Sequence, residues 1–242
     1  NQVSLFDLEN GSHPAQQRLI QEELLAHNLS MLRLRQRIRR DKAVSMSATG
    51  QLLNPFLASL PFKPTGAQQR VVGDITTDLE KAEPMMRLVQ GDVGSGKTLV
   101  AALAALQAIE SGYQVAMMAP TELLAEQHAV NFRSWFEPLE LKVGWLAGKL
   151  KGKARTQSLA DIESGDANIV IGTHAIFQEQ VVFNKLALII IDEQHRFGVH
   201  QRLGLREKGV SQGFHPHQLI MTATPIPRTL AMTAYADLDT SV

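Results

Sequence analysis

Residues 91–98 constrain the fold more than any other segment, because they match the pattern G-x-x-x-x-G-K-[ST]. They lie between an apolar run that predicts a strand and a run, residues 98–109, that predicts a helix. In that context the glycines let the loop wrap so that backbone N–H groups point at phosphate oxygens, and the helix N-terminus adds partial positive charge. The alternative is a chance glycine-rich turn before a helix.

The residue types of this segment, hereafter the phosphate loop, indicate individual roles. Lys97 would neutralise the outer phosphates of a nucleotide, and the Thr98 hydroxyl would ligate magnesium. The remaining residues would line the phosphates; they are Gly91, Asp92, Val93, Gly94, Ser95 and Gly96.

A second motif follows the apolar strand predicted at residues 187–191, which ends on the adjacent carboxylates Asp192 and Glu193. A buried strand does not tolerate unpaired charge there without a reason. Asp192 would hold magnesium through its water shell, and Glu193 would orient and deprotonate an attacking water. An exposed loop after the strand is the alternative. His195 is either a polar coupler near the γ-phosphate or an ordinary capping or surface histidine.

From residue 67 onward, short apolar runs alternate with longer helical segments, which predicts an α/β fold with a parallel sheet covered on both faces. The predicted strands are nearly continuous apolar runs, as buried parallel strands should be: 87–90, 114–118, 142–146, 169–172, 187–191 and 218–221. Helices should begin near Lys97, Thr121, Lys151 and Pro227. In such a sheet the ligand crevice lies beyond the carboxyl ends of the strands.

The N-terminal part predicts one long helix over residues 14–42, with Pro14 in its first turn. Its second half, from Arg33 to Lys42, is strongly basic and either packs against a neighbouring domain or contacts duplex phosphates. Asn54-Pro55 and other breakers follow, so we place a domain boundary between residues 43 and 63. The expected organisation is a helical linker over 1–61 and a nucleotide-binding domain over 62–242.

Gln68 opens the helix predicted over residues 67–81, three positions after Thr65. A Gln side chain carries a donor and an acceptor, so Gln68 could read the N6 and N7 edge of adenine, with Phe62 stacking nearby. Thr65 as a simple N-cap and Gln68 as a surface residue describe the same residues equally well.

Three further loops follow predicted strands and place hydroxyl and helix-start N–H groups at one edge of the sheet. Such groups suit DNA phosphates, which position a strand without reading its sequence. Helix capping is the alternative use of these threonines. The candidates for DNA contact or coupling are Pro120, Thr121, Thr173, His174, Thr222, Thr224 and Arg228. A basic cluster, Lys149, Lys151, Lys153 and Arg155, is likewise either a backbone-contact loop or a solvated face.

Composition narrows the class of protein. The absence of cysteine excludes a disulfide framework and thiolate metal sites. No apolar run approaches the roughly 18 residues that a spanning helix needs, so we expect no membrane partner. The net charge is +0, and composition therefore gives no support for nucleic-acid binding. Such binding would have to rest on local patches.

Taken in order, these motifs resemble the motif series of superfamily-two helicases. A closer resemblance, carried by residues 192–199 and 222–229, is to the RecG-type fork-remodelling helicases and to the related transcription-repair coupling factors. Gln194, the sequence Leu60-Pro61-Phe62 and the basic helix favour the RecG type.

The resemblance implies a RecA-like P-loop NTPase domain preceded by a helical linker, with ATP and Mg²⁺ as cofactors. It implies branched or forked DNA as the partner, contacted mainly through phosphates, and a place in the bacterial cytosol near the nucleoid. Thr222 and Thr224 would couple nucleotide state to DNA.

The same resemblance implies a second RecA-like domain and a DNA-binding wedge domain, neither of which we find in this sequence. An arginine finger from a second domain is worth about 10³ to 10⁵ in rate. We therefore expect these 242 residues alone to bind nucleotide weakly and to hydrolyse it negligibly. Two rival interpretations are a transcription-repair coupling translocase and a nucleotide-dependent switch, and Glu193 argues against the switch.

Overall fold

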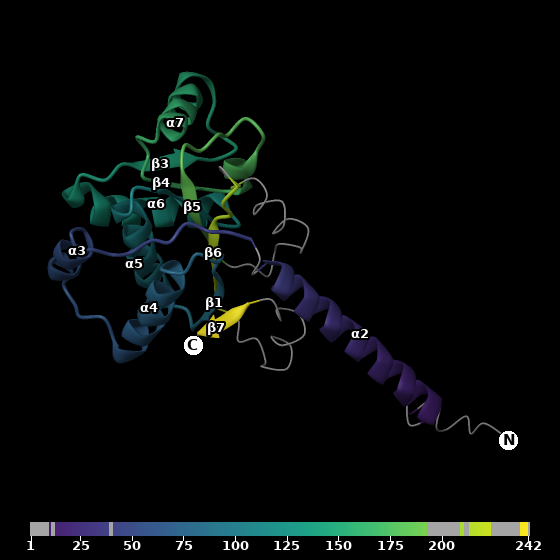
Figure 1. The fold of residues 1–242 in the computed structure, drawn as a ribbon. Coiled ribbons are helices and arrows are strands. Elements are labelled where there is room, and N and C mark those ends of the chain that lie inside the picture. Colours follow the sequence, from purple (N-terminus) through teal and green to yellow (C-terminus); the bar gives the residue numbers. More distant parts are fainter. Residues whose placement is uncertain are drawn as a thin grey trace. The chain divides into compact units, whose positions relative to one another are not determined.

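The computed structural model describes residues 10, 13–38, 41–192, 209–210, 213–223 and 238–241. The chain divides into two compact units, which are described separately. The first contains the helix α2 (Pro14–Ile38), so the predicted start at Pro14 is confirmed, and the helix ends before the expected residue 42 (Figure 1). The second begins at Asp41 and contains the sheet. No helix among the described residues is long and apolar enough to cross a membrane.

The second unit is built on seven parallel strands in the order β3-β4-β2-β5-β6-β1-β7. Each predicted strand is found with ends within one residue of the expected ones, which confirms the parallel α/β fold. The strands are β1 (Met86–Gln90), β2 (Gln114–Met118), β3 (Val143–Leu146), β4 (Ile169–Gly172), β5 (Leu186–Asp192), β6 (His217–Thr222) and β7 (Asp239–Ser241). β7 is not predicted from the sequence, because its three residues form no apolar run.

Helices follow most of these strands and begin close to the expected positions. They are α3 (Leu53–Ser59), α4 (Gly66–Leu79), α5 (Lys97–Glu110), α6 (Glu122–Phe136) and α7 (Gly152–Ser164), with short 3₁₀ turns η1 (Glu137–Leu139) and η2 (His174–Phe177). Thr65 and Thr121 cap α4 and α6 by accepting hydrogen bonds from Gln68 N and Leu124 N. The helix expected near Pro227 lies outside the described residues.

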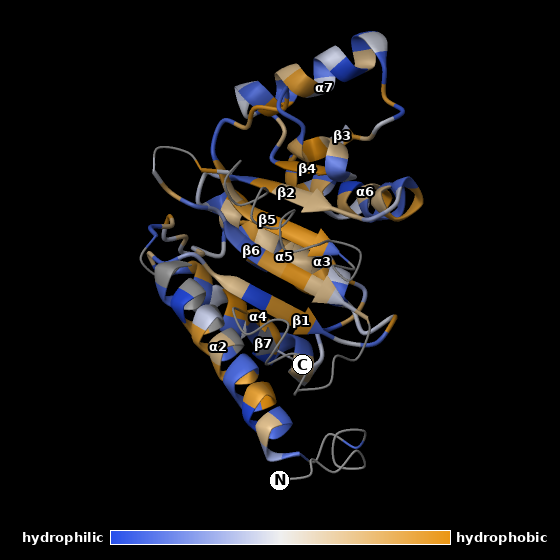
Figure 2. Ribbon diagram, turned by 90° about the vertical axis from the view of Figure 1, so that its right-hand side faces the viewer, coloured by the Kyte–Doolittle hydropathy of each residue, from blue (hydrophilic) through white to orange (hydrophobic). Residues whose placement is uncertain are grey.

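The hydrophobic core packs α3 to α6 against one face of the sheet. Residues 99–109 of α5 are all buried, which matches a helix that is apolar all round. Alternate residues of a strand share a face, so Leu188 and Ile190 of β5 point into this core. Hydrophobic residues, coloured orange, predominate in the central strands (Figure 2).

The compact unit includes residues 41–61, which the sequence predicts to be part of the linker. Met46 and Phe56 are fully buried in the core, and the Phe56 ring lies 5.9 Å from the ring of Trp135 on α6. The sequence predicts a break at Pro55, yet Pro55 occupies the first turn of α3, where proline is tolerated. The compact unit therefore extends about twenty residues before the expected boundary at residue 62.

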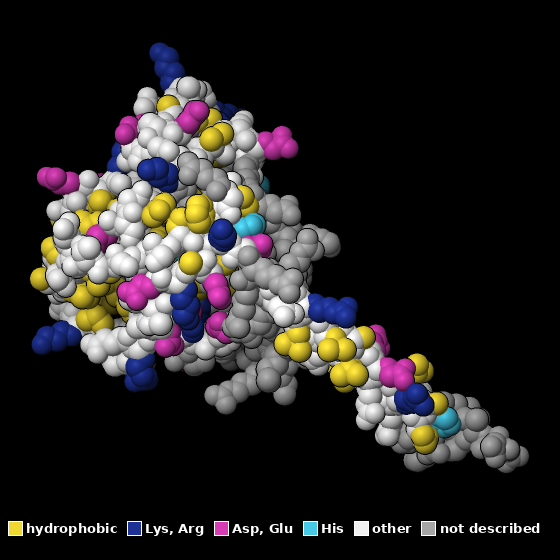
Figure 3. Space-filling model, in the orientation of Figure 1, with side chains coloured by type: hydrophobic (Ala, Val, Ile, Leu, Met, Phe, Trp, Pro, Cys, Tyr) yellow, Lys and Arg dark blue, Asp and Glu magenta, His cyan; other side chains and the backbone are white. Residues whose placement is uncertain are grey.

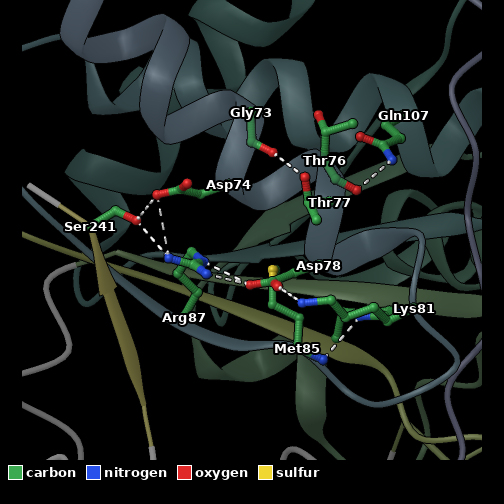
Figure 4. A network of polar contacts seen from close by, with 11 residues as sticks. Gly73, Asp74, Thr76, Thr77, Asp78, Lys81, Met85, Arg87, Gln107 and Ser241 are labelled. Atoms are coloured by element: carbon green, nitrogen blue, oxygen red, sulfur yellow. Dashed lines mark hydrogen bonds and ion pairs between the residues drawn. The ribbon is translucent and has the colours of Figure 1, made fainter.

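A polar network holds the edge strand β7, as Figure 4 shows. Arg87 of β1 donates to Asp78 Oδ2 of α4 from Nε at 2.9 Å, and to Ser241 Oγ of β7 from Nη1 at 2.7 Å. Ser241 Oγ in turn donates to Asp74 Oδ2 at 2.9 Å. Side-chain hydrogen bonds therefore fix β7 to α4 and β1.

Candidate nucleotide-binding site

Three neighbouring strands bring the main sequence motifs to one edge of the sheet. β6 lies between β1 and β5, and its register pairs Thr222 with Gln90 and Met221 with Asp192. The backbone N–H of Gly91 donates to Thr222 O at 3.2 Å. The structure therefore places the phosphate loop, Thr222 and Asp192 together, as expected for ligand-binding groups at the carboxyl ends of parallel strands.

Glycine is required at two positions where the phosphate loop turns. Gly94 and Gly96 both have φ +83°, a left-handed conformation that other residues adopt with strain. A β-carbon on Gly96 would also collide with the side-chain amide of Gln68, and one on Gly91 would lie 2.6 Å from Ser95 Oγ. At Gly91 and Gly96 the loop therefore packs closely against Ser95 and Gln68, which fits a loop wrapped around a phosphate ligand.

Lys97 reaches back across the loop from the first turn of α5. Its Nζ donates to the carbonyl oxygens of Gly91 at 2.6 Å and Asp92 at 2.8 Å. Thr98 follows it and is half-buried. The ammonium group therefore lies where phosphate oxygens could replace the two carbonyls, at a helix N-terminus that itself favours negative charge.

Gln68 contacts the phosphate loop directly. Its Nε2 donates to Ser95 O at 2.9 Å, and its Oε1 accepts from Thr65 N at 2.8 Å. Capping by Thr65 is thus confirmed, and Gln68 is more than a surface residue. An amide oxygen has two lone pairs and an amide nitrogen two hydrogens, so one of each stays available for an adenine edge. Phe62 is half exposed in the loop before α4.

Asp192 ends β5 and makes a contact that sequence reasoning missed. Its Oδ2 lies 2.6 Å from Nε2 of His128 on α6, and both side chains are buried. The one indication in the sequence was that His128, a polar residue, falls on the same helix face as the apolar residues Ala125, Ala129 and Phe132. Glu193 and His195 lie outside the described residues.

The candidates for DNA contact follow the strands at this edge. Thr121 uses its hydroxyl to cap α6, which confirms the capping alternative, and Pro120 is half-buried before it. Thr173 is buried after β4, whereas His174 on η2 is exposed. Thr222 is buried at the end of β6. Thr224 and Arg228 lie outside the described residues.

Part of the predicted basic cluster is engaged within the protein. Lys149 Nζ pairs with Glu122 Oε2 at 2.6 Å, and this hydrogen bond raises the pKa of Lys149 above its usual value. Arg155 donates to Gln178 at 2.9 Å. Basic and acidic side chains alternate over the face drawn in Figure 3, in agreement with a net charge of +0. A groove of about 480 Å³ adjoins Lys149, lined also by Arg133 and Trp145.

The donor set suits magnesium that is shared with a nucleotide. In the part of the chain that the structure describes, no three His, Asp or Glu side chains converge as a self-sufficient metal site. Mg²⁺ typically keeps several waters and takes one or two carboxylates or hydroxyls plus phosphate oxygens. Asp192 and Thr98, on either side of Thr222 at the same edge, fit that pattern.

Comparison with known proteins agrees with this geometry. Residues 65–233 match the model of the DEAD/DEAH box helicase family. The ATP-dependent DNA helicase RecG of Escherichia coli O157:H7 is 73% identical over 240 residues, which are 99% of this chain and 35% of that protein. The RecG of Haemophilus influenzae is 68% identical over the same shares. This chain thus spans about a third of the length of the curated relatives it matches.

Solved structures give the same result. The structure of RecG bound to a three-way DNA junction superposes with a TM-score of 0.82 and 40% identity, covering 93% of this chain and 30% of that one. The UvsW helicase of bacteriophage T4 has a TM-score of 0.57 at 16% identity, covering 81% of this chain and 67% of that one, and shows a shared fold only.

Proposed function

This chain belongs to the DEAD/DEAH box helicase family, and we propose that it is the first RecA-like motor domain of a RecG-type DNA helicase that remodels branched DNA. The convergence of the phosphate loop, Thr222 and Asp192 on adjacent strand ends carries the proposal. The RecG structure that superposes on this chain is bound to a three-way DNA junction, which supports branched DNA as the partner.

ATP would bind with its phosphates in the loop of residues 91–98 and its adenine against Gln68 and Phe62. Lys97 would exchange its two carbonyl partners for phosphate oxygens. Thr98 and Asp192 would hold magnesium, which when bound neutralises charge that develops on the phosphates. Glu193 would orient and deprotonate the attacking water, with His195 as a coupler beside it.

DNA would run along the same edge of the sheet. Its phosphates would meet Pro120, His174, Thr224 and Arg228 after β2, β4 and β6. The capping Thr121 and the buried Thr173 and Thr222 would instead couple these loops to the nucleotide site. The hydrogen bond from Gly91 N to Thr222 O joins this edge to the phosphate loop and would couple movement at the two places. A bacterial cytosolic location fits this role.

Turnover would need parts beyond these 242 residues. A second RecA-like domain would complete the ATP site with an arginine finger, and a wedge domain would recognise the branch point. Without the finger's contribution of about 10³ to 10⁵ in rate, this chain alone should hydrolyse ATP negligibly. Brisk DNA-stimulated hydrolysis by residues 1–242 would contradict this part of the proposal.

The test is ATP hydrolysis by a full-length protein containing this chain, measured without DNA and with single strands, linear duplex or a model fork. A Glu193→Gln variant, which should bind ATP without hydrolysing it, serves as the blank. Strongest stimulation by the fork supports the RecG-type function. Equal stimulation by plain duplex would favour a transcription-repair coupling translocase, and no stimulation would favour a nucleotide-dependent switch.

A further inference from the structure

α6 contacts the end of β5 through a buried hydrogen bond between His128 and Asp192, and hydrophobic packing alone does not explain this pair. His128 Nε2 lies 2.6 Å from Asp192 Oδ2, and each side chain is about nine-tenths buried. An ionised carboxylate only accepts hydrogen bonds, so Nε2 carries the hydrogen and donates it. Such charge-assisted hydrogen bonds are short and about twice as strong as neutral ones.

A histidine at this position carries a cost that an apolar residue would avoid. The other ring nitrogen of His128, Nδ1, is buried and has no hydrogen-bond partner in the described part of the chain. Its neighbours on the inner face of α6, Ala129 and Phe132, are fully buried hydrophobic residues. A leucine would pack there without leaving a buried polar atom unsatisfied, and such an atom lowers stability. We therefore attribute the histidine at this position to its hydrogen bond with the Asp192 carboxylate.

The geometry leaves Asp192 suited to its proposed task. Among the residues that the structure describes, His128 is the only hydrogen-bond partner of this carboxylate, and it occupies Oδ2. Oδ1 keeps its lone pairs for the water shell of a magnesium ion. A side chain held at one oxygen keeps one rotamer, and ligands oriented in this way bind metal more tightly.

We propose that His128 is a positioning residue for the magnesium site: it fixes the Asp192 carboxylate through Nε2 and ties the site to α6. The inference rests on the proposed nucleotide-binding function. It assigns His128 no contact with nucleotide or with the reacting atoms. Because α6 begins at Glu122, directly after Pro120 and Thr121, the same contact joins a candidate DNA-binding loop to the magnesium ligand.

The test uses a full-length protein containing this chain, three variants of it, and the binding of a fluorescent ATP analogue, mant-ATP, titrated with MgCl₂. His128→Leu fills the space without a donor. His128→Gln restores an amide N–H near the Nε2 position. Phe132→Leu, one turn further along the same face of α6, controls for altered helix packing. Circular dichroism and thermal unfolding establish that each variant is folded.

We expect His128→Leu to raise the Mg²⁺ concentration for half-maximal binding by about tenfold, while binding without Mg²⁺ stays unchanged. His128→Gln should recover most of that loss, and Phe132→Leu should match the wild type. A wild-type Mg²⁺ response in His128→Leu, or no recovery in His128→Gln, would overturn the inference. If the wild-type full-length protein itself bound mant-ATP no better with Mg²⁺, the proposed function would fail, and the inference with it.

Discussion

The side-chain nitrogen of Gln68 lies 2.9 Å from the carbonyl oxygen of Ser95, so the helix α4 is hydrogen-bonded to the phosphate loop. The same amide accepts from Thr65 N at 2.8 Å, which orients it without exhausting its donors and acceptors. One side chain can therefore support the loop and still present a donor and an acceptor to a base.

Replacing Gln68 with alanine should weaken both its support of the phosphate loop and its contact with the base. We expect about a tenfold loss of ATP affinity, because a bidentate contact to a base is worth about 1–3 kcal/mol. Preference for ATP over GTP should fall as well, since guanine presents an acceptor where adenine has its N6 donor. Competition binding with the two nucleotides measures both effects. The matched control is Gln69→Ala, because the Gln69 side chain donates to Pro64 O and does not contact the phosphate loop. This variant should bind both nucleotides like the wild type.

Gly96→Ala should abolish tight nucleotide binding. The substitution puts a side chain on a residue with φ +83° and drives it into the Gln68 amide. Gly112→Ala provides a comparison, because that glycine has φ +84° and open space around it. If both variants lost stability equally and both kept wild-type nucleotide affinity, the close-wrapped loop would not be needed for binding.

The network around Arg87 predicts a large loss of stability. Arg87 Nη2 lies 2.5 Å from Asp78 Oδ2, and the two side chains are only 12% and 11% exposed. Arg87→Leu removes two hydrogen bonds from the largely buried Asp78 carboxylate, which keeps its ion pair with Lys81 Nζ at 2.6 Å, and should cost about 1.5–3 kcal/mol in the free energy of unfolding. Chemical denaturation measures this. Arg18→Leu removes a solvent-exposed pair with Glu22 and should change stability by less than about 1 kcal/mol.

His217 predicts a loss of stability in mild acid. Its Nδ1 accepts from Met85 N at 3.0 Å and its Nε2 donates to Val44 O at 2.8 Å, an arrangement that only the neutral ring satisfies. Burial lowers the pKa of His217 below its usual 6.5, although the hydrogen bond with Val44 and the nearby Asp78 act to raise it.

The sign of the effect follows from proton linkage. Between the folded pKa and 6.5 the unfolded chain binds more protons at this residue, so its contribution to stability is present above pH 6.5 and is lost as the pH falls below that value. The free energy of unfolding should therefore decrease from pH 7 to pH 5. A His217→Asn variant should show a shallower decrease; an identical slope would mean that His217 does not titrate in this range.

Features that are determined by residues close together in the sequence could be predicted, and features that depend on contacts between distant residues could not. Buried parallel strands are apolar runs, so six strands were found within one residue, whereas β7 is polar and depends on Arg87 and Asp74. The phosphate loop could be predicted because the spacing of its glycines, Lys97 and Thr98 is itself the motif. The contact of His128 with Asp192 joins residues 64 positions apart, and no local pattern encodes it.

The start of the compact unit at Asp41 could not be predicted from the sequence, because it too depends on contacts between distant residues. Residues 41–61 contain breakers and isolated apolar residues, yet Phe56 packs against Trp135 and Phe136 from a distant part of the sequence. Glu110 accepts hydrogen bonds from Gln51 N at 3.0 Å and from Leu52 N at 3.4 Å, which holds the turn before α3. Tertiary contacts of this kind override what the local composition suggests.

The most direct test of the account is remodelling of a model replication fork by a full-length protein containing this chain. The fork carries a fluorophore and a quencher on the two strands that separate when it is driven backward. We predict ATP- and Mg²⁺-dependent strand separation with the wild type and none with Lys97→Ala, although both bind the fork. Separation without ATP, or equal separation by Lys97→Ala, would contradict the assignment of this chain as the ATP-binding motor of a fork-remodelling helicase.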